Sequence, residues 1–105
     1  MKRVRRRYLA VGIDSEARFS SAEFMDAVYG AVLKLYGEYG ASQTGLVLIG
    51  YEMEQRFAVV RVAHVAVEMV RTALATMTRI GDKSVAVHVL AVSGTIKALR
   101  AKTSR

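Results

Sequence analysis

The chain has 105 residues, of which 52% are hydrophobic and none is cysteine, so it suits one globular domain and excludes disulfide and thiol chemistry. Its formal net charge is +7, which points away from acidic, self-repelling tails and toward an anionic partner. The chain contains no run of eighteen apolar residues, so no membrane span is predicted. Its start is basic, but charged residues interrupt the apolar stretch that follows too early for a signal peptide, so we expect a cytoplasmic protein.

Seven elements are predicted along the chain from hydrophobic periodicity and from turn signals. Ser20 and Glu23 form a capping-box pattern that predicts a helix start, and Gly37 and Gly40 predict its end. Gly81 and Asp82 predict a turn before the last strand. The expected elements are a strand at 7–13, a helix from 21 to about 37, strands at 45–52 and 56–64 joined by a turn at 53–55, a helix at 65–80, a strand at 83–92 and a short helix at 96–102.

This order predicts an α/β (α+β) fold of the ferredoxin-like, βαββαβ type. With right-handed crossovers the four strands form an antiparallel sheet in the order 4-1-3-2, with two helices on one face. We expect residues 1–6 to be a basic N-terminal extension and residues 7–105 to form a single domain that ends in a basic helix. The other sheet face is apolar, and we expect the C-terminal helix, through Ile96 and Leu99, or a partner protein to cover it.

The positive charge is concentrated at the two ends of the chain. Residues 1–7 and 97–105 hold nine Lys and Arg and no acid, while the residues between them hold seven basic and nine acidic side chains. In the predicted sheet the first strand begins beside the end of the fourth, so the two ends would form one basic patch. Such a patch favours a nucleic acid, whose condensed counterions are released on binding. Basic tails that only aid solubility and a membrane surface are the alternatives.

Candidate catalytic and metal sites are poorly supported. The two histidines, His64 and His88, lie on different strands and lack neighbouring ligands at metal-binding spacing, so we expect no metal site and no catalytic residues. The first helix is apolar nearly all round, which indicates either a broad core face or a protein interface. The interface residues would be Phe24, Met25, Tyr29, Val32 and Tyr36.

RNA-recognition domains share this topology, but their strand-three pattern is only partly present. Phe57, Ala58 and Val60 match, whereas valines at 59 and 62 replace the aromatic residues that stack on bases. A free-standing single-strand RNA binder remains an alternative that requires Tyr8 and Phe57 to be exposed. A small-molecule regulatory module on the same fold is a further alternative.

Four segments carry a family resemblance: RYLAV at 7–11, GEYGASQTGLVLIGYE at 37–52, RVAH at 61–64 and VLAVSGTIKALR at 89–100. Together they resemble the family of protein component 2 of archaeal ribonuclease P, which eukaryotic relatives share with ribonuclease MRP. The resemblance spans roughly residues 7–102.

The resemblance implies a ribonucleoprotein subunit and not a protein catalyst. In that family the RNA subunit uses magnesium to remove the 5′ leader of precursor tRNA, and the protein binds no cofactor. The expected partners are ribonuclease P RNA, precursor tRNA and protein component 3, with self-association in a heterotetramer. The expected contacts to the RNA backbone are Arg5, Arg6, Arg7, Ser93, Gly94, Thr95, Lys97, Arg100 and Lys102, with Arg61 and His64 as further candidates.

Overall fold

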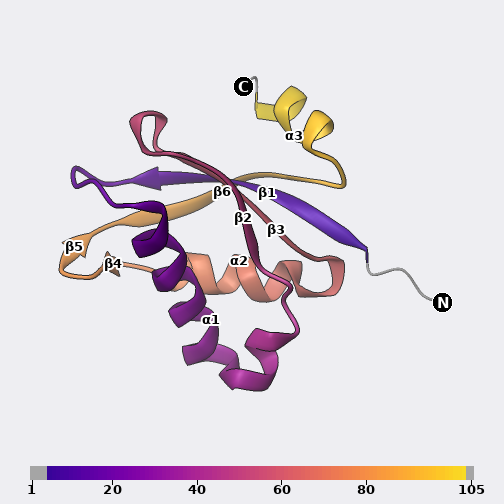
Figure 1. The fold of residues 1–105 in the computed structure, drawn as a ribbon, viewed down its shortest axis with the longest axis horizontal. Coiled ribbons are helices and arrows are strands. Elements are labelled where there is room, and N and C mark those ends of the chain that lie inside the picture. Colours follow the sequence, from indigo (N-terminus) through magenta and orange to yellow (C-terminus); the bar gives the residue numbers. More distant parts are fainter. Residues whose placement is uncertain (1–4, 104–105) are drawn as a thin grey trace.

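The computed structural model of the chain describes residues 5–103 and gives a mixed α/β fold (Figure 1). Residues 1–4, most of the expected extension, lie outside the described part, as do residues 104–105. The elements are β1 (Arg6–Asp14), α1 (Ser21–Ser42), β2 (Val47–Glu52), η1 (Met53–Gln55), β3 (Phe57–Ala63), η2 (His64–Ala66), α2 (Val67–Thr76), β4 (Arg79–Ile80), β5 (Lys83–Ser84), β6 (Ala86–Ser93) and α3 (Ile96–Thr103). None of the described helices is long and apolar enough to cross a membrane.

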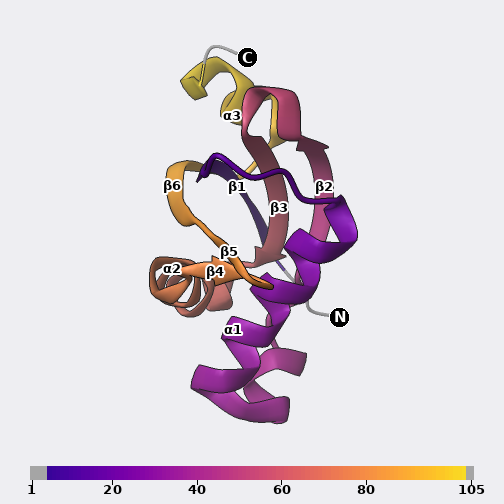
Figure 2. The same ribbon diagram turned by 90° about the vertical axis from the view of Figure 1, so that its left-hand side faces the viewer.

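A four-stranded antiparallel sheet forms the centre of the molecule, in the order β2-β3-β1-β6. α1 and α2 lie on one face of this sheet and α3 lies on the other, as both Figure 1 and Figure 2 show. Successive side chains of β1 point to opposite faces of the sheet, so the strand contributes to the packing on both. Leu9, Val11 and Ile13 are buried with α1 and α2, whereas Ala10 is buried with Leu99 of α3.

The region from residue 79 to residue 93 differs from the prediction. One strand was expected at 83–92, but β4 and β5 form a separate two-stranded hairpin and only β6 joins the main sheet. The hairpin turns at Gly81, whose φ of 64° suits glycine. The main sheet still has four strands, and it reads β6-β1-β3-β2 from one edge to the other; β6 takes the edge place beside β1 that was expected for the strand at 83–92, and β2 occupies the other edge.

The first two helices also differ from their predicted bounds. α1 continues past Gly37, which takes a non-helical conformation (φ 73°, ψ 178°) and bends the helix before it resumes. Packing of Ala41 against Val32 and Ala73, in a small buried cluster, stabilises the last turn of α1. α2 ends at Thr76, earlier than expected, and Met77 still reaches the core from an extended residue.

The capping box at the start of α1 is confirmed. The Ser20 hydroxyl accepts from the Glu23 amide at 3.1 Å, and the Glu23 carboxylate accepts from the Ser20 amide at 2.9 Å. The Ser20 amide, with Lys83 nearby, lowers the pKa of Glu23 below its ordinary value of 4.5. The ionised carboxylate therefore stabilises the folded state.

Glu23 should contribute to the pH dependence of stability. Because its folded pKa is lowered, its contribution is complete above pH 4.5 and is lost as the pH falls through the lowered pKa. We expect Glu23→Gln to reduce the fall in unfolding free energy over that acidic range, measured by urea denaturation at several pH values. Asp26→Asn, at an exposed carboxylate of the same helix, is the control; equal changes in the two variants would contradict the role of the capping box.

Candidate nucleic-acid interface

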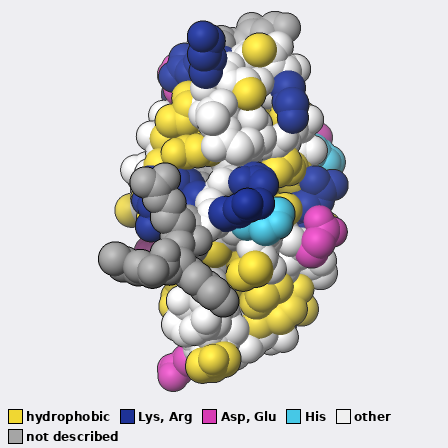
Figure 3. Space-filling view, turned by 90° about the vertical axis from the view of Figure 1, so that its right-hand side faces the viewer, with side chains coloured by type: hydrophobic (Ala, Val, Ile, Leu, Met, Phe, Trp, Pro, Cys, Tyr) yellow, Lys and Arg dark blue, Asp and Glu magenta, His cyan; other side chains and the backbone are white. Residues whose placement is uncertain are grey.

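Three segments that are distant in sequence meet at one end of the sheet. Arg6 on β1 pairs with Ala63 on β3, and the His64 amide donates to the Arg5 carbonyl oxygen at 2.7 Å. On the other side of β1, Tyr8 pairs with Ser93. Figure 3 looks onto this end and shows Lys and Arg side chains gathered there. β1 begins at Arg6, so this residue belongs to the sheet and not to an extension.

The turn between β6 and α3 lies against Arg7. A Cβ built on Gly94 would lie 3.7 Å from the Arg7 Nη1 atom. The Thr95 hydroxyl accepts from the Ala98 amide at 3.1 Å and so caps α3. Ser93 is only 7% exposed, and its Oγ accepts from the Thr95 amide at 3.4 Å. The Ser93 hydroxyl is therefore used inside the turn. Of the three turn residues predicted to contact RNA, only Gly94 and Thr95 are exposed.

The three cations of α3 do not point the same way. The Lys102 Nζ donates to the Val92 carbonyl oxygen at 2.7 Å, which places it on β6 beside β1. Arg100 instead lines a groove with Glu52 and Phe57, toward the opposite edge of the sheet. Lys97 is exposed. The expectation of a single patch thus fits Lys102 and does not fit Arg100.

The predicted RNA-contacting cations lack carboxylate partners within residues 5–103. Both ion pairs there are elsewhere: Arg18 with Glu54, and Arg71 with Glu68 at 3.7 Å. Like charges held together without counter-charges repel one another, and an anionic ligand would relieve that repulsion. This end of the molecule is consequently suited to a polyanion.

The sheet face under α3 is closed to base stacking. Phe57 is 8% exposed and packs with Ala10 and with Leu99, which is 1% exposed. The expectation that the C-terminal helix covers this face is confirmed for the part around Phe57 and Ala10, while Ile49 on β2 and Leu90 on β6 stay exposed. A single-strand RNA reader needs an exposed ring at Phe57, and in this structure α3 covers that ring.

The predicted protein interface on α1 is only partly available. Phe24 and Val32 are fully buried in the chain's own core, because α1 packs on both the sheet and α2. Met25 and Tyr36 are half-buried, while Tyr29 is 43% exposed.

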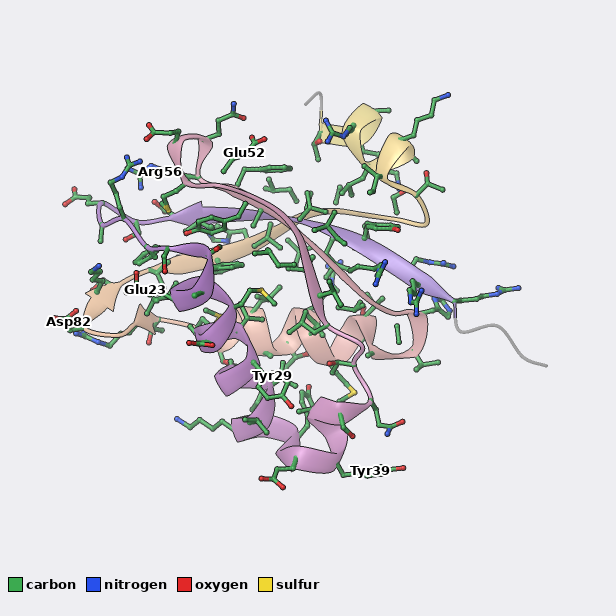
Figure 4. All side chains as sticks on the ribbon, in the orientation of Figure 1. Glu23, Tyr29, Tyr39, Glu52, Arg56 and Asp82 are labelled. Carbon is green, nitrogen blue, oxygen red and sulfur yellow. The ribbon has the colours of Figure 1, made fainter. Side chains whose placement is uncertain are left out.

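Two exposed side chains on α1 escaped the sequence analysis. Leu35 is exposed although it is apolar, and Tyr39 is 80% exposed beyond the expected helix end. Figure 4 shows Tyr29 and Tyr39 on α1, with Tyr39 projecting outward at its far end. Gly37 was expected to end the helix, whereas it bends the helix, so the sequence did not place Tyr39 on a further helical turn.

No three His, Asp or Glu side chains in the part of the chain that the structure describes gather closely enough to hold a metal ion. The histidines expected to be separate do lie apart, since His64 comes directly after β3 and His88 lies on the edge strand β6.

The chain is similar in sequence and in fold to known proteins. The family model described as "Rpp14/Pop5 family" matches residues 7–104. The chain is 35% identical to ribonuclease P protein component 2 of Methanosarcina barkeri over 95 residues, which are 90% of this chain and 69% of that protein. It is 34% identical to the Thermococcus kodakarensis protein of the same name over 100 residues, covering 95% and 83%. A chain in the cryo-EM structure of yeast ribonuclease MRP has the same fold, with a TM-score of 0.73, 15% identity and coverage of 90% and 79%.

Proposed function

Because the chain belongs to the Rpp14/Pop5 family, we propose that it is a protein subunit of ribonuclease P that binds the catalytic RNA. The carrying observation is that Arg5, Arg6 and Arg7 lie at the end of the sheet where Arg7 meets the exposed turn at Gly94, and that none of the three has a carboxylate partner among residues 5–103. Backbone phosphates would occupy this end, and such contacts position an RNA without reading its bases. Gly94 allows close approach because it has no side chain.

In the proposed complex this chain supplies no reacting group. The RNA subunit, with magnesium, would cleave the 5′ leader from precursor tRNA in the cytoplasm. Protein component 3 would bind a different surface of this chain, and two such pairs would join through it. The exposed Tyr29, Leu35 and Tyr39 of α1 offer apolar area for one of these protein contacts.

A reconstitution tests the proposal directly. Ribonuclease P RNA, component 3 and precursor tRNA are combined at limiting magnesium, with and without this chain, and 5′-leader release is measured over time. We expect cleavage to require the chain, because its cations would lower the repulsion between RNA phosphates that magnesium otherwise screens. Cleavage that proceeds equally without the chain would reject the proposal.

A further inference from the structure

A hollow opens where the start of β2, the end of β3 and the last part of α1 meet. Its volume is about 410 Å³, and its walls include Arg6, Arg61, Tyr29, Thr44 and Val47. We refer to it as the Arg61 hollow. The volume lies in the range of sites for small organic ligands.

Arg61 has an unsatisfied donor at this site. Its neighbours across the sheet are Tyr8 on β1 and Val47 on β2, neither of which carries an anionic group. The Arg61 Nε atom is buried and has no hydrogen-bond partner among the described residues. A guanidinium is always ionised in proteins, and a buried donor without an acceptor is unfavourable. An acceptor that enters the hollow would satisfy it once the half-buried Arg61 side chain turns toward the opening.

The chemistry of the walls selects the kind of acceptor. Two arginines, Arg6 and Arg61, line the hollow, and no Asp or Glu does. The Thr44 hydroxyl is uncharged and already donates its proton to the Ala41 carbonyl oxygen at 2.8 Å, so the donors left for a ligand are those of the two arginines. The donors of a guanidinium group match the paired oxygens of a phosphate, and the negative charge of the phosphate would balance the positive charges of the two arginines.

We propose that the Arg61 hollow binds one phosphate group, with the half-buried Arg61 as the anchor and Arg6 at the exposed rim. The proposal rests on the proposed RNA-binding function, in which this phosphate belongs to the RNA backbone. The remaining volume then accommodates the nucleotide that carries it. This contact is separate from the turn at Gly94, so the RNA would be fixed at two points on the same end of the sheet.

The test monitors the arginine Nε–H signals by NMR while inorganic phosphate is added, against sodium chloride of equal ionic strength. We expect the Arg61 signal, assigned by its loss in Arg61→Gln, to shift with phosphate and to saturate. A short RNA hairpin should shift the same signal. Arg61→Lys keeps the charge but loses the fork, so it should bind the hairpin about tenfold more weakly than the native chain.

Two further variants keep the test decisive. Arg6→Gln at the exposed rim should also weaken phosphate binding, and it decides the matter if Arg61→Gln does not fold. Arg56→Gln, on the β2–β3 hairpin labelled in Figure 4, changes the same charge elsewhere and should leave phosphate binding intact.

The outcomes separate the two proposals. If the hairpin binds the native chain and Arg61→Gln equally, and the Arg61 signal stays unmoved, the hollow is not a phosphate site while the RNA-binding function stands. If inorganic phosphate shifts the signal but no RNA binds, the hollow is a site for free phosphate and the RNA-binding function fails.

Discussion

Replacing Arg5, Arg6 and Arg7 together with glutamine should weaken binding to unrelated RNAs alike, by roughly tenfold or more at physiological salt. The reason is that these three arginines follow one another at the start of β1, at one end of the sheet, and have no carboxylate partners among the described residues. Phosphate contacts release counterions, so the slope of log affinity against log salt should become shallower by about 2 to 3 when three contacts are lost. Fluorescence anisotropy over a salt series measures both quantities.

A matched variant separates local contact from net charge. Arg18, Arg71 and Arg79 provide the same change of three charges, and each already has a partner: Glu54, Glu68 and the Asp82 carbonyl oxygen, respectively. Replacing these three with glutamine should change RNA affinity by less than about threefold, the scale expected of weak long-range electrostatics at physiological salt. If both triple variants lose affinity equally, only overall charge matters and the interface is misplaced. If the first variant loses one RNA and retains others, the contacts read bases.

Leu99→Ala should lower the free energy of unfolding by about 2–5 kcal/mol, the range for a leucine removed from a packed core. Leu99 is the fully buried residue of α3, and it closes the sheet face over Phe57 and Ala10. Its loss would leave a cavity and free the helix that carries Lys97 and Lys102. Urea denaturation gives the stability, and hydrogen exchange of the α3 amides reports whether that helix opens first.

Leu90→Ala is the control for this change, because Leu90 is 52% exposed on the edge strand β6. The same atoms are removed, and we expect a cost of about 1 kcal/mol or less for a largely solvent-exposed side chain. A Leu99→Ala variant as stable as Leu90→Ala would show that α3 contributes little to the fold.

The parts of the fold that could be predicted are those with a regular local pattern. The alternation of Leu9, Val11 and Ile13 identified the central strand, and the spacing of Ser20 and Glu23 identified the start of α1. Ile96 and Leu99 identified the helix that covers the second sheet face, since an amphipathic segment must bury its apolar side.

The parts that escaped prediction depend on single residues or on contacts distant in sequence. The short strands β4 and β5 have two residues each and therefore no period to detect. The positive φ of Gly37 rotates the last turns of α1 relative to the first, so the exposure of Tyr39 could not be foreseen. The sequence motif flagged Arg61, but its unpartnered Nε is a property of three neighbouring strands in register.

The position of β1 in the sheet has a consequence for how the protein is made. β1 is synthesised first among the strands, yet its two neighbours are β3 and β6, and β6 is the last strand to be synthesised. Contacts so distant in sequence slow folding, because the chain must close a long loop before they form. On the ribosome, β1 therefore waits with an open edge until β6 emerges, a state that chaperones protect in other nascent chains. An incomplete chain lacks the turn beside Arg7, so only finished protein can present the whole basic end to RNA.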